Sequence, residues 1–65
     1  MINTMKVDEV KKNAVKQAEY YRKQAQQKAD PNLYEVAGQY YYTAGMNYEA
    51  NLCWDAADAL RRGDK

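Results

Sequence analysis

A single proline, Pro31, divides this chain of 65 residues into two halves. From Thr4 to Ala29 there is neither glycine nor proline, and most residues are strong helix formers such as Ala, Lys, Gln, Glu and Arg. Proline disfavours helical geometry in the residue before it and lacks an amide hydrogen, so a helix must end near Asp30. The first half therefore predicts one long helix over residues 4–29, after which the chain turns back.

The apolar residues of this predicted helix recur every three or four positions, which is the spacing of a single buried stripe. Alanine dominates the stripe, and alanine allows a neighbouring helix to approach closely while removing little surface from water. We therefore expect a partner helix to pack tightly along it. The stripe consists of Val7, Val10, Ala14, Ala18, Tyr21, Ala25 and Ala29.

The second half is helical again in pattern, over residues 32–61. Asp30 is a good N-cap for this arm, and Pro31 suits the first turn. Gly45 lies near its middle, where a glycine costs about 1 kcal/mol relative to alanine. We expect the arm to be kinked or broken near Gly45, which gives an all-α helical hairpin with three helices; a helix continuous to Arg61 is the alternative.

Composition limits how such a hairpin is stabilised. A chain this short forms one small domain, residues 1–65, and buries only about 60% of the surface that the unfolded chain exposes. Small domains usually add disulfides, a metal or a partner chain, and here there is a single cysteine and no histidine. No stretch is apolar enough to cross a membrane. We expect a cytoplasmic protein stabilised by association with itself or with another chain.

The residues that most catalytic and metal sites require are missing. The chain has no serine and no histidine, so Cys53 has no imidazole base, and its place on the predicted inner face with Leu52, Ala56, Ala57 and Leu60 favours a buried position. Zinc sites need clusters of Cys and His, and phosphate-binding loops need grouped glycines. We therefore expect no enzyme activity, no catalytic residues, no cofactor and no bound metal.

Residues 31–62 resemble a single tetratricopeptide repeat, a helix-turn-helix with fixed large and small positions. Two positions depart from the repeat, because Ala37 replaces a leucine and Arg62 a proline, and residues 1–30 add no second repeat. The resemblance implies a protein-interaction module in which Gly38, Ala50 and Ala57 allow close helix packing. The matching residues are Tyr34 at the tryptophan position, Gly38, Tyr41, the turn glycine Gly45, the pair Ala50 and Trp54, and Ala57.

Aromatic residues with a polar tip are the candidates for a contact surface. Tyr40, Tyr41 and Tyr42 are consecutive, so on a helix they fan out and at least one, taken to be Tyr42, must face outward. We expect a self-associating module, a small adaptor or inhibitor, in which Val10, Ala14, Ala18 and Tyr21 pack on Tyr41, Ala50, Trp54 and Ala57. The interface candidates are Tyr20, Tyr21, Tyr34, Tyr41, Tyr42, Tyr48 and Trp54.

The alternative function is binding of nucleic acid or a nucleotide through the first half. Residues 1–30 carry seven Lys/Arg against four Asp/Glu, whereas residues 31–65 carry three against five. Lys12, Lys16, Arg22 and Lys23 could contact phosphates beside exposed tyrosines. Glu19 weakens this basic surface, so we expect the partners to be another copy of the chain and another protein, rather than nucleic acid, a membrane or a metal ion.

Overall fold

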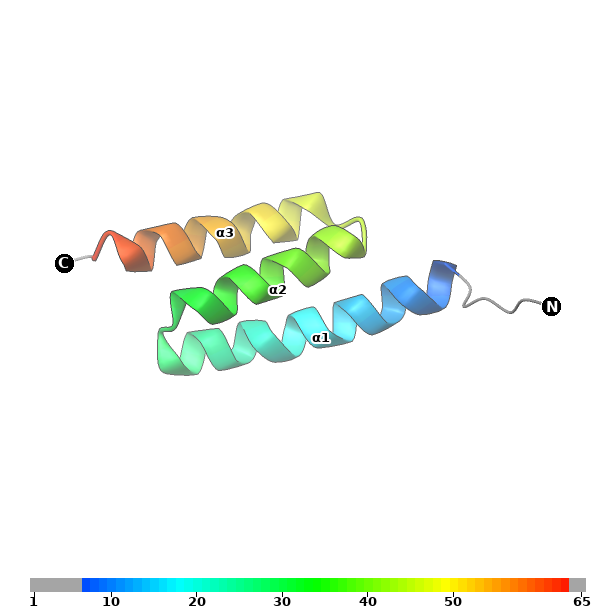
Figure 1. The fold of residues 1–65 in the computed structure, drawn as a ribbon, viewed down its shortest axis with the longest axis horizontal. Coiled ribbons are helices and arrows are strands. Elements are labelled where there is room, and N and C mark those ends of the chain that lie inside the picture. Colours follow the sequence, from blue (N-terminus) through cyan, green and yellow to red (C-terminus); the bar gives the residue numbers. More distant parts are fainter. Residues whose placement is uncertain (1–6, 64–65) are drawn as a thin grey trace.

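A computed structural model describes residues 7–63 as three α-helices. They are α1 (Val7–Lys28), α2 (Pro31–Thr43) and α3 (Asn47–Arg61), and successive helices run antiparallel (Figure 1). The all-α hairpin predicted from the sequence is confirmed, and its second arm is broken at Gly45 rather than continuous. Residues 4–6 of the predicted first helix lie outside the described range.

The three helices lie side by side, with α2 in the middle (Figure 1). α2 packs against both α1 and α3, whereas α1 and α3 barely touch each other. A small domain more often stacks its elements in two layers around one core. Here each outer helix keeps one free edge, on the side turned away from α2.

The corner between α1 and α2 is closed by a left-handed residue. Ala29 has φ 51°, and the amide of Asp30 donates to the carbonyl of Ala25 at 3.2 Å. This is a Schellman-type helix end with alanine where glycine is usual. The prediction that the first helix includes Ala29 is therefore wrong by one residue. Asp30 caps α2 as expected, because its side chain accepts from the amide of Asn32 at 2.9 Å.

The corner between α2 and α3 repeats this geometry with glycine. Gly45 has φ 81°, the amide of Met46 donates to Tyr41 at 2.8 Å, and the amide of Gly45 donates to Tyr42 at 2.9 Å. Both bonds belong to the Schellman motif, in which a left-handed residue ends the helix. Gly45 breaks the arm because it adopts a conformation that other residues avoid.

The core is thin and built largely from alanine. A central cluster joins all three helices, and no large side chain in the described part of the chain is completely buried. Tyr41, 2% exposed, is its largest member. The cluster consists of Ala18, Ala37, Tyr41, Ala50 and Cys53.

The predicted apolar stripe of α1 is buried only in part. Ala14, Ala18 and Ala25 are buried against α2, but Val10 is 39% exposed and Ala29 is exposed in the corner. α1 has 22 residues and α2 has 13, so the beginning of α1 lies near the end of α2 and receives little cover. The structure describes the backbone of Val7 but not its side chain.

The helices are also distinct from membrane spans. Across residues 7–63, none combines the length and the apolar composition that a membrane crossing needs.

Candidate interaction surfaces

The α2–α3 contact is built around Trp54 lying against the backbone of Gly38. A Cβ atom added at Gly38 would lie 2.6 Å from Cδ1 and 2.9 Å from Cε2 of the indole, closer than real side chains come. Ala50 and Ala57 are buried on the same side of α3. The small residues thus lie where the two helices meet most closely. Tyr42 extends this contact, with its ring centre 6.1 Å from that of Trp54.

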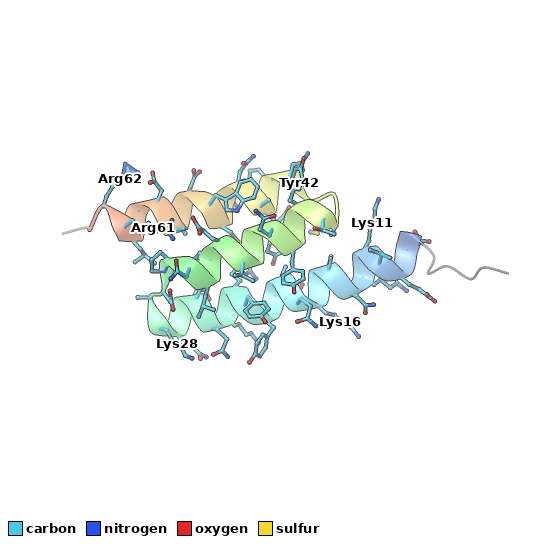
Figure 2. The ribbon with its side chains drawn as sticks, viewed as in Figure 1. Lys11, Lys16, Lys28, Tyr42, Arg61 and Arg62 are labelled. Atoms are coloured by element: carbon cyan, nitrogen blue, oxygen red, sulfur yellow. The ribbon has the colours of Figure 1, made fainter. Side chains whose placement is uncertain are left out.

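Polar bonds hold the far end of the same contact. The guanidinium of Arg61 donates to the carboxylate of Glu35 and, at 2.8 Å, to the side-chain oxygen of Asn32. Figure 2 shows Arg61 on the side of α3 that faces α2 and Arg62 on the opposite side. The hydrogen bond from Arg61 lowers the pKa of Glu35, and the same bond raises the pKa of Arg61. Arg62, the C-cap residue of α3, pairs with Asp58 at 2.9 Å.

Tyrosines line the α1–α2 contact. Tyr21 stacks on Tyr40, with ring centres 5.7 Å apart and planes inclined by 2°, and Tyr20 meets the Tyr21 ring edge-on at 5.2 Å. Such aromatic pairs are favourable beyond the area that they bury. A shallow hollow of about 270 Å³ opens over the same two helices. It is lined by Val10, Asn13, Ala14, Gln17, Tyr40 and Thr43.

A second shallow hollow, of about 520 Å³, lies over α2 and α3. Its lining combines three polar residues with one valine and the tryptophan, and two of the polar ones, Asn32 and Glu35, are already bound by Arg61. Neither hollow is a closed cavity. The second is lined by Asn32, Glu35, Val36, Gln39 and Trp54.

The predicted aromatic interface residues do not form one surface. Tyr41 is buried in the core, and Tyr21, Tyr34 and Trp54 are half-buried within the chain. The accessible ones lie on three different helices: Tyr20 on α1, Tyr42 on α2 and Tyr48 on α3, which are 57%, 58% and 71% exposed. Tyr42 faces outward as the sequence predicted.

Arg22 and Cys53 both lie near Tyr41. The Arg22 guanidinium carbon is 6.0 Å from the centre of the Tyr41 ring, within the range of a cation–π contact. Cys53 is buried, and burial raises the pKa of its thiol as well as that of the Tyr41 hydroxyl. A thiol with a raised pKa holds less of the reactive thiolate. This agrees with the structural role expected for Cys53.

The free edge of α3 carries exposed apolar side chains. Leu52 is 49% exposed and Tyr48 71%, and both point away from the buried Ala50 and Ala57 on the helix. The sequence had grouped Leu52 with the inward residues Cys53 and Ala57. Leu52 lies four residues after Tyr48 and seven residues before Ala59, and residues at these spacings share one side of a helix. This spacing was the sign in the sequence that Leu52 lies on a different side of the helix from Ala57. The α3 free edge is defined as Tyr48, Leu52, Asp55 and Ala59.

The free edge of α1 is basic instead. Lys12, Lys16 and Lys23 are exposed and lie half a turn from the buried alanines Ala14 and Ala18. These three lysines define the α1 lysine edge, and the exposed Glu19 lies on the same side of α1, about one turn from Lys16 and from Lys23. Figure 2 shows Lys16 on the side of α1 that is turned away from α2. Arg22, which the sequence grouped with them, reaches over the Tyr41 ring. It also borders a third shallow hollow, of about 370 Å³, which is lined by Lys16, Glu19, Tyr20, Arg22 and Lys23.

Comparison with models of known protein families, with curated proteins and with solved structures finds no match to this chain.

Proposed function

We propose that this protein is a non-enzymatic interaction module that associates with itself and uses the α3 free edge to do so. The observation that carries this proposal is the exposure of Leu52 and Tyr48 along one line of α3. Both are large, and both lie on the side of α3 that no helix of the described chain covers. A partner chain would remove them from water.

The thin core supports the same proposal. Burying a leucine-sized side chain contributes about 1.5–3 kcal/mol, and an alanine much less. With a core made mainly of alanine and no large side chain completely buried, residues 7–63 gain little from internal packing. Covering the α3 free edge adds apolar burial that the single chain lacks. An adaptor or inhibitor would use the same edge on another protein's surface.

Sedimentation of the purified chain over a range of concentrations tests self-association. We expect oligomers at about 100 µM, where interactions in the micromolar range are well populated. Replacing Leu52 with Gln should reduce association at least about tenfold, because a polar amide in an apolar contact loses its water. Asn51→Gln is the matched control, since it places the same residue at an exposed neighbouring position on α3.

A folded monomer at every concentration would contradict the proposal. Binding of a single-stranded oligonucleotide that weakens steeply as salt rises would instead favour the nucleic-acid function, because phosphate contacts release counterions. If that binding does not depend on the oligonucleotide sequence, and if it is lost when Lys16 and Lys23 are replaced with Glu, then α1 is the surface that binds the oligonucleotide.

A further inference from the structure

The two free edges of the layer differ in charge. α1 contains six Lys/Arg against three Asp/Glu, whereas α3 contains one against three. Arg61 of α3 and the C-cap residue Arg62 are already engaged, Arg61 with Glu35 and Arg62 with Asp58. Within the described part of the chain, no ion pair engages the Asp55 carboxylate on the α3 free edge, the half-buried Glu49 beside that edge, or the amines of the α1 lysine edge. Three lysines against Glu19 leave the α1 edge net positive, whereas Asp55 makes the α3 free edge negative.

We propose that the α1 lysine edge of a second copy covers the α3 free edge, so that the chain associates head to tail. This inference rests on the self-association proposed above and names the surface that takes part. The pairing must be between copies, because α2 separates α1 from α3 within one chain. Contacts between two different surfaces do not close on themselves unless a ring forms, so assembly is open-ended.

The two edges match in length. Lys12 to Lys23 and Tyr48 to Ala59 each span eleven residue steps, or about 16 Å of helix. Lys16 and Lys23 are about 10 Å apart along α1, and Glu49 and Asp55 about 9 Å apart along α3. With the helices antiparallel, Lys16 lies beside Asp55 when Lys23 lies beside Glu49.

The lysine edge also suits an apolar counterpart. Lysine side chains lay their aliphatic stems on apolar surface and keep the amine in water. Tyr20, 57% exposed and next to this edge on α1, adds an aromatic ring that comes opposite Leu52 in the same register. The stems and the ring cover Leu52 and Tyr48 while the amines meet the carboxylates.

A symmetric pairing of two α3 free edges is disfavoured by charge. It would bring Asp55 and Glu49 of one copy toward the same carboxylates of the other, and like charges placed together oppose association. The head-to-tail pairing exchanges that repulsion for attraction.

Two variants that each disable one edge distinguish these arrangements. Lys16→Glu/Lys23→Glu reverses the lysine edge and keeps the α3 free edge, while Leu52→Gln/Asp55→Gln removes the apolar and acidic groups of the α3 free edge and keeps the lysine edge. We expect each variant alone to be monomeric in sedimentation and an equimolar mixture to form a heterodimer that grows no further, because only one native contact remains. Lys11→Glu/Lys28→Glu is the control, with the same change in net charge at exposed positions outside the edge.

The outcomes separate the two proposals. Self-association of Lys16→Glu/Lys23→Glu that equals that of the unmodified chain would overturn the head-to-tail contact and leave the α3 free edge in use. A mixture that stays monomeric would also overturn it. A monomeric unmodified chain would instead refute self-association itself.

For the unmodified chain, we expect the affinity of self-association to fall about tenfold between about 0.05 M and about 0.5 M NaCl, because salt screens exposed charges. Far-ultraviolet circular dichroism checks that every variant remains helical.

Discussion

The two helix contacts of this protein are built differently. α2 and α3 meet through a tryptophan on a glycine backbone, with an arginine bound to Glu35 and Asn32 at one end. α1 and α2 meet through alanines and a stacked tyrosine pair, and no side-chain hydrogen bond joins them among the described residues. Specific geometry is therefore concentrated in the α2–α3 hairpin, while α1 is held mainly by close packing.

The largest expected effect is at the glycine under Trp54. Gly38→Val should destabilise the fold by about 2–3 kcal/mol, because the added methyl groups overlap the indole and force it outward. Urea unfolding followed by circular dichroism measures the loss, and emission of the single tryptophan should shift to longer wavelength in the folded state. Gln39→Val, at the exposed next position, is the control. Equal stability of the two variants would mean that the indole does not depend on this contact.

The corners offer a reciprocal pair of substitutions. Gly45→Ala should cost about 1 kcal/mol, because φ 81° is strained for alanine even though the added Cβ meets only open space, with Lys11 Nζ 3.9 Å away. Thermal unfolding measures it. A gain in stability would show that α2 and α3 join into one helix when the glycine is removed.

The opposite change is expected at the other corner. Ala29→Gly should stabilise the protein by about 0.5–1 kcal/mol, because glycine relieves the left-handed strain but gives the unfolded chain more freedom. The same unfolding experiment compares it with Lys28→Gly, which places glycine one residue earlier inside α1 and should destabilise. If both substitutions destabilise equally, Ala29 is not left-handed in solution.

The smallest effect concerns the Arg61–Glu35 pair. The folded state lowers the pKa of Glu35 below its ordinary 4.5, so the pair stabilises fully above that value. This contribution disappears as the pH falls through the lowered pKa. Both groups are exposed, so we expect a slightly lower unfolding midpoint for Glu35→Gln near neutral pH and no difference at about pH 2–3. A difference that persists in acid would point to packing rather than charge.

Local chemistry accounts for what could be predicted from the sequence. The Asp30-Pro31 pair ends one helix and starts the next by its own backbone preferences, and Gly45 stops α2 in the same way. At least one of the three adjacent tyrosines had to be exposed, because they cannot share one buried face, and Tyr42 is exposed. Ala29 carried no such signal, since alanine rarely adopts a positive φ.

The remaining features depend on how the helices are placed. Arg61 and Glu35 are 26 residues apart and meet only because the hairpin fixes their register. The sequence suggested that α1 packs on Tyr41, Ala50, Trp54 and Ala57. Ala18 does share the core cluster with Tyr41 and Ala50, but α1 lies mainly against α2, and α3 packs on α2 rather than on α1. Periodicity identifies an apolar face without saying which neighbour covers it, and this is also why Leu52 was grouped with the core.

The central position of α2 has a consequence for folding cooperativity. Because α1 and α3 barely touch, α2 is the main route by which the stability of one outer helix reaches the other, as in linear repeat proteins whose units interact only with their neighbours. Opening of α1 need not disrupt the hairpin beyond it. Amide hydrogen exchange should then show two levels of protection, with α1 exchanging at a lower opening free energy than α2 and α3.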